Sequence, residues 1–258
     1  MKYKLTMIKI GGSVITDKKV AYQPREENIS ALAKVIKKAK QTLIIAHGAG
    51  SFAHVSAKKY GGKKGFSSRF GIAKVAFDAS EINHIVMKIF IEEGLPAVSF
   101  RPMSLVTATE GRLRSNFFHV LDLVIQYGLI PVMFGDVVWD YTWKSTIYSG
   151  ETIINKIAIY MNRMGHNIEQ IIQLTDTDGV LDDRGHTIPV LHYDDWPKIK
   201  KYISRPKGAD VTGGMTHKLD KSFQMTRYGI KTLIINGTKP SLLEKVLLGE
   251  KVIGTEII

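Results

Sequence analysis

The chain of 258 residues contains no cysteine. Disulfide bonds, thiolate metal sites and cysteine nucleophiles are therefore excluded. The sequence also lacks an uninterrupted apolar run of the roughly 18 residues that a membrane-spanning helix needs, so we expect a soluble protein without a membrane partner. Its first residues read as a core strand and lack the pattern of a signal peptide, which favours a cytoplasmic location.

Acidic residues are scarce in the N-terminal part of the chain. Residues 1–75 hold 16 lysines and arginines against three acidic residues, a formal charge of +13, whereas the remaining residues sum to −1. This asymmetry favours an anionic partner, either a nucleic acid, an acidic membrane or a phosphorylated small molecule. A solvated basic face explains it equally well. The sequence has no helix-turn-helix, zinc-finger, RNA-recognition or KH pattern, so we expect no nucleic-acid partner and keep a nucleic-acid-binding protein that uses the basic N-terminal third only as a remote alternative.

Short apolar runs alternate with helical patterns along the chain. The apolar runs, which are typical of buried strands, are residues 6–10, 42–46, 96–100, 129–134, 171–174 and 231–235. The helical patterns lie between them, at about 26–40, 52–60, 74–93, 116–128, 152–164 and 215–228. This alternation predicts an α/β fold, a three-layer αβα sandwich with a mostly parallel central sheet.

Three segments depart from the alternation and predict β-hairpins. They are residues 105–113, 137–148 and 180–190, each with turn-forming residues near its middle. No linker composition interrupts the sequence. We therefore expect a single domain over residues 1–258, with two lobes.

Glycine loops follow the first two predicted strands. Lys9 stands near the end of the first strand, before Gly11, Gly12 and Ser13. The second loop runs G-A-G-S-F-A-H and ends at His54. Glycines let the backbone approach a phosphate closely, and the N–H groups at a helix start can bind its oxygens. Each loop can equally be a structural turn, and a lone histidine is more often structural.

Common nucleotide-binding patterns are absent or incomplete. The second loop fits G-x-G-x-x-A, but residues 66–75, where a dinucleotide site requires an acidic strand end, contain no acid. The sequence also has no G-x-x-x-x-G-K-[ST] and lacks the protein-kinase signature set. A Rossmann dinucleotide site, an ordinary P-loop and a protein kinase are therefore excluded.

Small and acidic residues also follow the later predicted strands. Asp136 follows a Phe-Gly pair, Gly150 stands between Ser149 and Glu151, and Asp176 opens T-D-T-D-G-V. The last of these resembles the start of an EF-hand loop, but the glutamate that an EF-hand requires is missing. None of these signals is specific alone, whereas their order along the chain is.

Taken in order, K-I-G-G-S, T-D-K, H-G-A-G-S-F-A-H, F-G-D, S-G-E-T, T-D-T-D-G-V and D-V-T-G-G-M-T-H-K resemble the amino-acid kinase family over nearly the whole chain. His54 narrows the resemblance to the branch of archaeal-type isopentenyl phosphate kinases and the related fosfomycin kinases. The resemblance implies ATP-dependent phosphorylation of a small phosphate, isopentenyl phosphate in the first branch, and a homodimer. It further implies an acceptor-binding lobe over about 1–170 and a nucleotide-binding lobe over about 171–258.

The resemblance also implies roles for individual residues. The ATP site would be formed by Lys9, Gly11, Gly12, Ser13, Gly50, Asp176, Gly213 and Lys218. The acceptor site would be formed by Ala49, His54 and Gly150. The catalytic lysines would be Lys9, Lys18 and Lys218. Mg²⁺ would travel with ATP, and no residue is assigned to it.

Three positions depart from the expected family pattern. Ala49 stands where a third consecutive glycine is common, Phe134 where a histidine is common, and Glu151 where an aspartate is usual. A kinase of fosfomycin, a phosphonate or another small acid remains an alternative, as does a nucleotide-binding module without catalysis. An apolar series beyond the second loop is either core or a slot for an acceptor tail; it comprises Phe66, Phe70, Val75, Phe77, Ile82 and Val86.

Overall fold

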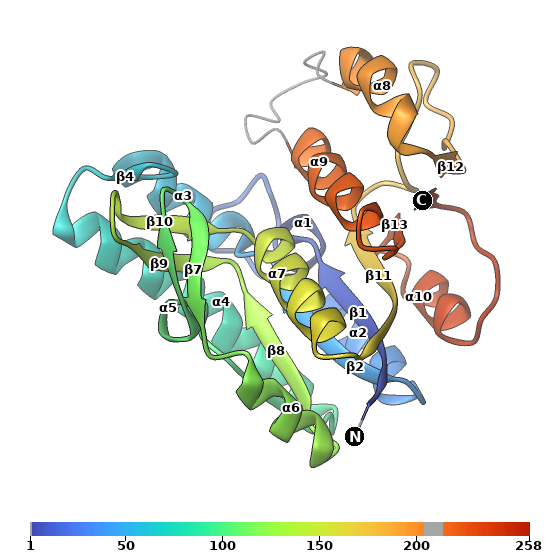
Figure 1. The fold of residues 1–258 in the computed structure, drawn as a ribbon, viewed down its shortest axis with the longest axis horizontal. Coiled ribbons are helices and arrows are strands. Elements are labelled where there is room, and N and C mark those ends of the chain that lie inside the picture. Colours follow the sequence, from blue (N-terminus) through green and yellow to red (C-terminus); the bar gives the residue numbers. More distant parts are fainter. Residues whose placement is uncertain (1, 204–213) are drawn as a thin grey trace.

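The computed structural model describes residues 2–203 and 214–258. It is organised around a sheet with the strand order β12 (Val190–Leu191), β14 (Thr255–Ile257), β13 (Thr232–Asn236), β11 (Asn167–Thr175), β1 (Lys4–Ile10), β2 (Thr42–His47), β8 (Ile130–Phe134) and β5 (Ala97–Ser99) (Figure 1). The strands from β13 to β5 run parallel, and β14 pairs antiparallel with β13. The carboxyl ends of the central strands therefore lie along one edge of the sheet.

The central strand β1 is buried on both faces, as its nearly continuous apolar sequence predicts. Successive side chains of a strand point to opposite faces. Leu5 and Met7 accordingly belong to one core cluster, while Ile8 and Ile10 belong to the other. Lys9 shares the face of Leu5 and Met7.

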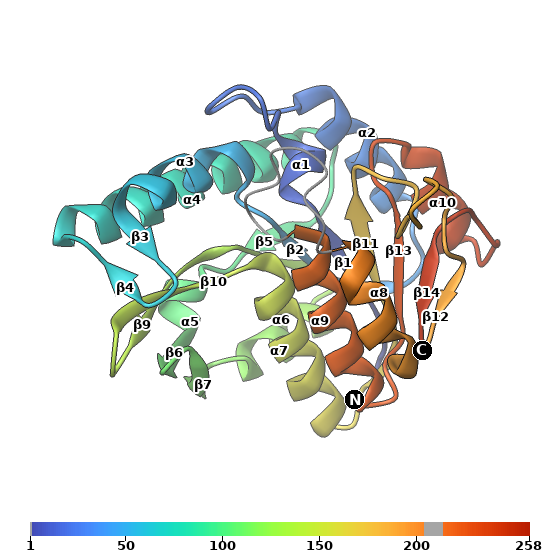
Figure 2. The ribbon, with the colours of Figure 1, turned by 90° about the horizontal axis from the view of Figure 1, so that it is seen from above.

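Helices cover both faces of the sheet. One core cluster includes residues of α2 (Glu26–Lys37), α4 (Arg69–Glu92) and α10 (Pro240–Leu247). The opposite cluster includes residues of α6 (His119–Gln126) and α7 (Gly150–Arg163), and α9 (Gly214–Thr226) packs beside α7. Seen from above, the strands lie between these two layers (Figure 2). The predicted three-layer αβα sandwich is confirmed.

Several short helices were not predicted from the sequence. They are α1 (Gly12–Ile15), α5 (Pro102–Leu105), α8 (Trp196–Ile203) and α10. The four residues of α1 and of α5 show too little of the 3.6-residue period to be separated from loops, and α8 and α10 span only about two turns each. Among the helices that the structure describes, none is both long and apolar enough to cross a membrane.

A second sheet confirms two of the predicted hairpins. Its order is β10 (Lys144–Tyr148), β9 (Asp136–Asp140), β6 (Val106–Thr109) and β7 (Arg112–Asn116), with antiparallel β6–β7 and β9–β10 pairs. The Asp140 carboxylate accepts hydrogen bonds from the backbone N–H groups of Glu110, Gly111, Thr142 and Trp143. One carboxylate thus joins the turns of both hairpins.

The third predicted hairpin, at residues 180–190, is reduced to one antiparallel bridge between Leu181 and Thr187. Two very short strands, β3 (Gly61–Gly62) and β4 (Gly65–Phe66), form a further hairpin that the sequence did not predict. Residues 182–185 are four consecutive polar or exposed turn residues. Few residues of the segment therefore remain for pairing between its two halves.

Candidate functional site

Two glycine loops touch each other at the carboxyl ends of β1 and β2. A Cβ atom on Gly12 would lie 2.7 Å from the Cα atom of Gly50, and one on Gly48 would lie 2.7 Å from the Gly12 nitrogen. Gly50 has a φ of +53°, a left-handed conformation that favours glycine. These glycines are therefore required for the close approach of the two loops.

The Thr16 hydroxyl fastens the two loops together. Its Oγ1 atom donates a hydrogen bond to the Gly12 carbonyl at 2.8 Å and accepts one from the Ser51 N–H at 2.9 Å. Ser51 lies in the first turn of α3 (Gly50–Tyr60), where N–H groups have no partner within the helix. Thr16 therefore accepts a hydrogen bond from one free N–H group of the α3 N-terminus, a role that no sequence motif indicated.

Lys9 and Glu151 form a buried ion pair below these loops. Lys9 is only 2% exposed, and its ammonium group donates a hydrogen bond to the Glu151 carboxylate. Glu151 lies in the first turn of α7, a position that favours a negative charge. Burial by itself raises the pKa of the Glu151 carboxyl, but the charges of Lys9 and Lys218 outweigh it and hold the pKa well below its ordinary value. The Glu151 carboxyl group is therefore ionised at neutral pH.

Gly150 allows α7 to approach the end of β2. A Cβ atom at this position would lie 2.8 Å from the His47 carbonyl oxygen and 3.3 Å from the Cε atom of Lys9. The preceding Ser149 caps the helix by accepting a hydrogen bond from the Thr152 N–H. The S-G-E-T segment therefore starts the helix, brings it against the sheet and directs Glu151 at Lys9.

Lys18 and Asp176 form a second ion pair nearer to solvent. The Lys18 Nζ atom lies 3.0 Å from the Asp176 Oδ2 atom, and the lysine side chain is 56% exposed. Partial burial raises the pKa of Asp176, but hydrogen bonds from Lys18 and Ser13 and the Lys18 charge outweigh this and lower it. Asp176 directly follows β11, the neighbour of β1, so the pair joins the end of β11 to the segment that follows α1.

Lys218 completes a cluster of three lysines and two carboxylates. It lies on α9, partly buried, and its pKa is lowered by desolvation and by the positive charges of Lys9 and Lys18. The carboxylates of Glu151 and Asp176 act in the opposite direction. With three lysines and two carboxylates, this cluster has a formal charge of +1 beside the glycine loops. Such a surplus is complementary to an anionic ligand.

His54 faces the same cluster from α3. Desolvation by the surrounding chain is the main cause that lowers the pKa of its imidazole, and the charges of Lys9, Lys18 and Lys218 add to the effect. The Glu151 charge opposes them. Since its pKa lies below the ordinary 6.5, the ring is mostly neutral at pH 7 and has one N–H donor and one acceptor nitrogen.

His217 is a neighbour of the cluster that the sequence analysis did not single out. Its Nε2 atom lies 3.2 Å from the Ser149 hydroxyl, so α9 contacts the N-terminus of α7. Desolvation lowers the pKa of the His217 imidazole. The only sequence signal for this residue was its position directly before Lys218 in the T-G-G-M-T-H-K segment.

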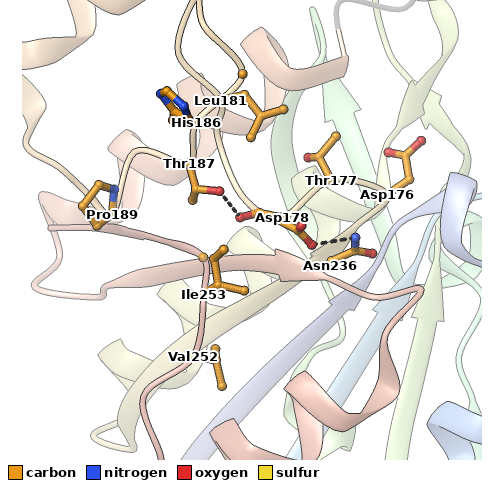
Figure 3. A pocket seen from close by; sticks show the side chains of 12 residues that line it. Asp176, Thr177, Asp178, Leu181, His186, Thr187, Pro189, Asn236, Val252 and Ile253 are labelled. Carbon is orange, nitrogen blue, oxygen red and sulfur yellow. Dashed lines mark hydrogen bonds between the residues drawn. The ribbon is translucent and has the colours of Figure 1, made fainter.

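A cavity of about 660 Å³ opens next to Asp176, beyond the carboxyl ends of β11 and β13 (Figure 3). This volume is within the range of small-molecule sites. Polar and apolar side chains both contribute to its walls, which are formed by Asp176, Thr177, Asp178, Leu181, Gly185, His186, Thr187, Pro189, Asn236, Val252, Ile253 and Gly254. Through Asp176, the cavity therefore adjoins the lysine cluster on the side of the C-terminal strands of the sheet.

Asp178 is held in the wall of this cavity by several contacts. Its carboxylate accepts hydrogen bonds from Lys239 Nζ at 2.8 and 2.9 Å and from Asn236 Nδ2 at 2.9 Å. The Thr187 hydroxyl donates to its backbone carbonyl at 3.0 Å. These bonds fix the T-D-T-D-G-V segment, whose aspartates lie beside Lys18 and Lys239 respectively.

The structure brings nearly all of the predicted site residues to one edge of the sheet. The two glycine loops, the start of α7 and the three lysines meet there; these residues are Lys9, Gly11, Gly12, Ser13, Lys18, Ala49, Gly50, His54, Gly150, Asp176 and Lys218. Gly11 has a packing reason as well, since a Cβ there would lie 2.6 Å from the Leu174 carbonyl oxygen. Gly213 lies outside the described residues.

The three departures from the family pattern fit the structure locally. Ala49 has a right-handed backbone conformation with φ of −85°, so its side chain causes no strain. Phe134 stacks on the buried His47 ring, with centroids 5.7 Å apart. Glu151 reaches Lys9 directly. The longer side chain is thus used in an ion pair.

The apolar series beyond the second loop divides into two groups. Val75, Ile82 and Val86 are buried in the core cluster, as the core interpretation predicts. Phe70 and Phe77 are instead 65% and 56% exposed on the surface of α4. The series as a whole is therefore not one continuous face.

Comparisons with known proteins identify relatives along the whole chain. The sequence model of the amino acid kinase family matches residues 4–236. Isopentenyl phosphate kinases of Methanothermobacter thermautotrophicus and Methanocaldococcus jannaschii are 31% and 33% identical, each over 98% of this chain and 98% of the relative.

Solved structures give the same grouping. A structure described as an isopentenyl phosphate kinase superposes with a TM-score of 0.81 at 29% identity, covering 98% of this chain and all of the other. A substrate complex of an isopentenyl phosphate kinase superposes with a TM-score of 0.77 at 25% identity over 98% of this chain and all of the other. The chain belongs to the amino acid kinase family.

Proposed function

We propose that the chain transfers the γ-phosphoryl group of ATP to isopentenyl phosphate, giving isopentenyl diphosphate and ADP in isoprenoid biosynthesis. The observation that carries this proposal is the surplus positive charge of Lys9, Lys18 and Lys218 at the meeting point of two glycine loops. The full-length relatives described as isopentenyl phosphate kinases support the choice of acceptor.

The chemistry of the reaction suits this set of side chains. An acceptor phosphate oxygen forms a bond to the γ-phosphorus, while the bond from that phosphorus to the β,γ-bridging oxygen breaks and ADP leaves. The second pKa of a phosphate monoester is about 6, so the attacking oxygen is already anionic at neutral pH. No proton has to be removed from it, and both carboxylates of the cluster remain free to hold lysines. Catalysis then rests on positioning and on stabilising the charge of the transition state.

We assign the residues on either side of the transferred group as follows. Lys9, Gly11, Gly12, Ser13 and Gly50 would surround the ATP phosphates. His54, Ala49 and Gly150 would hold the acceptor phosphate on the other side. Lys18 and Lys218 would contact the group in transit between them. This arrangement offsets the repulsion between two anionic substrates.

The cavity beside Asp176 is the proposed site of the nucleoside part of ATP. Asp176 joins this cavity to Lys18, and its volume suits a small ligand. On this proposal residues 1–170 supply most acceptor contacts and residues 171–258 most nucleoside contacts.

Mg²⁺ enters the proposal together with ATP, whose phosphate oxygens are hard ligands of the type that this ion prefers. In residues 2–203 and 214–258 no group of three histidine or acidic side chains is arranged to hold a metal ion. We derive no step through the ion.

We also propose a homodimer, which sedimentation-equilibrium measurements would test.

An ADP-release assay tests the proposed acceptor. We expect saturable ADP formation with isopentenyl phosphate, at a kcat/KM at least about 100-fold above that with fosfomycin, carbamate or glutamate. Dimethylallyl phosphate, an isomer of the same size, should be used at a rate between these limits. Phosphorus NMR should show a new diphosphate product. Faster turnover of fosfomycin would favour the alternative acceptor, and no ADP with any of them would contradict a kinase.

Replacing His54 by alanine should mainly weaken acceptor binding. The neutral imidazole offers one N–H donor to a phosphate, so its loss should raise the acceptor KM roughly tenfold, the effect of one lost hydrogen bond to a charged group. The KM for ATP should change little. His84→Ala on the outer side of α4 is the matched control and should leave both constants unchanged. An unaltered acceptor KM in His54→Ala would remove this residue from the site.

A further inference from the structure

Lys18 lies on a protruding loop, residues 17–24, that connects α1 to α2. The base of the loop is closed by backbone hydrogen bonds from Asp17 N to Gln23 O at 2.9 Å and from Arg25 N to Ile15 O at 2.8 Å. Residues 18–21 at its tip are exposed. A long lysine side chain on such a tip has many accessible positions, so something must restrict it if it is to act at one point.

Tyr22 anchors the far side of this loop. Its hydroxyl donates a hydrogen bond to the Asp78 Oδ2 atom at 3.1 Å, and its ring lies edge-on to Phe52, with centroids 5.5 Å apart. Tyr22 has a φ of +57°, a conformation that is unfavourable for a bulky residue. The side-chain contacts hold the backbone in that conformation. They therefore set the path of the loop that carries Lys18.

Asp78 is a fully buried carboxylate on α4 with no part in the lysine cluster. Its side chain is 0% exposed and accepts a hydrogen bond from Lys74 Nζ, one helical turn earlier, at 2.6 Å. The Lys74 ammonium group also lies 5.4 Å from the centroid of the Tyr22 ring. Burying a carboxylate costs free energy unless partners compensate, and apolar residues would fill such a position without that cost. We therefore interpret the buried Asp78 carboxylate as a hydrogen-bond acceptor that holds Tyr22 of the loop.

We propose that Tyr22 and Asp78 are positioning residues that hold the 17–24 loop so that Lys18 meets the transferring phosphoryl group. This inference rests on the proposed kinase function for the role of Lys18. The loop is fixed on one side by Tyr22 against α3 and α4, and Lys18 reaches across to Asp176 on the other. Asp78 acts through Tyr22 and does not touch a substrate.

Tyr22→Phe tests the proposal because it removes only the phenolic hydroxyl and keeps the ring. We expect kcat to fall roughly tenfold with both KM values unchanged, since a small misplacement of a catalytic group costs rate more than ground-state binding. In a Lys18→Ala background the same substitution should change kcat less than about twofold, because no lysine remains to be positioned. Asp78→Asn should behave as Tyr22→Phe does. Val20→Ala, an exposed change in the same loop, is the control and should have no effect.

Hydrogen exchange of the loop amides gives a readout that does not depend on the substrate. Without ligands, the amides of residues 17–24 should exchange several-fold faster in Tyr22→Phe than in the unchanged protein or in Val20→Ala. Unchanged exchange rates in Tyr22→Phe would overturn the proposal that Tyr22 holds the loop, even if the protein proved to act on another acceptor. An equal loss of kcat in the presence and absence of Lys18 would overturn the positioning of that lysine and leave a general structural role.

Discussion

Replacing Lys18 by alanine should lower kcat by about 10²- to 10³-fold, the range found when one charge-stabilising group is removed from a preorganised site. The Lys18 ammonium group would contact the transferring phosphoryl group, whose equatorial oxygens carry the charge of the transition state. Its side chain is 56% exposed, so its removal should leave folding stability nearly unchanged. The expected loss is therefore one of catalysis and not of structure.

Steady-state kinetics and calorimetric titration with ATP would separate these effects. The Kd for ATP should change less than about tenfold, because glycine loops and other lysines hold the nucleotide on the present proposal. Lys19→Ala is the matched control, since Lys19 is an exposed neighbour on the same loop whose backbone N–H, and not its ammonium group, bonds to Asp17. Turnover of Lys18→Ala near the original rate would contradict the mechanism.

The edge of the sheet that holds the proposed site could be predicted from the sequence. Apolar runs that end in glycine, such as those before Gly11 and Gly48, indicated parallel strands, and the carboxyl ends of parallel strands meet on one edge. The position of Lys9 followed from the first of those loops, whereas Lys18 was indicated only by the resemblance to the family. The register of β1 then determines that Lys9 points towards α7, as the alternation of buried side chains shows.

The pairings within the cluster could not be predicted. Lys9 and Glu151 are 142 positions apart, and no local pattern connects a strand residue to the first turn of a distant helix. The same holds for Tyr22 and Asp78, since Asp78 reads as an ordinary polar position in a helical pattern. Such contacts depend on how the layers pack, and that information is spread over the whole chain.

The charge asymmetry of the sequence acquires a local meaning in the structure. The basic segment of residues 1–75 supplies Lys9 and Lys18, while the carboxylates that pair with them, Glu151 and Asp176, come from the later part of the chain. Most other lysines of this segment are exposed. The surplus charge that concerns function is therefore the one within the cluster.

Replacing Glu151 by alanine should lower the free energy of unfolding by about 3–5 kcal/mol, because it leaves Lys9 buried without a partner. Lys9 would then face Lys218 with no carboxylate between them. Lys9→Met should cost less, since Glu151 retains the attraction of Lys218. The double variant Lys9→Met/Glu151→Leu should recover most of the stability, because it replaces the pair with apolar side chains of similar volume, and yet show no kinase activity. Urea denaturation at pH 7 measures the free energy of unfolding of all three variants.

Acid titration of the same variants distinguishes the ion pair from simple packing. The pKa of Glu151 in the folded protein lies below its ordinary value of 4.5, so its contribution to stability is fully present above pH 4.5 and is lost as the pH falls towards the folded value. The unchanged protein should therefore lose more stability between pH 6 and 3.5 than Lys9→Met/Glu151→Leu does. Glu92→Ala, at an exposed ion pair with Lys88, is the control and should cost less than about 0.5 kcal/mol. Equal acid sensitivity of the unchanged protein and the double variant would mean that the neighbouring lysines do not lower the pKa of Glu151 in the folded protein.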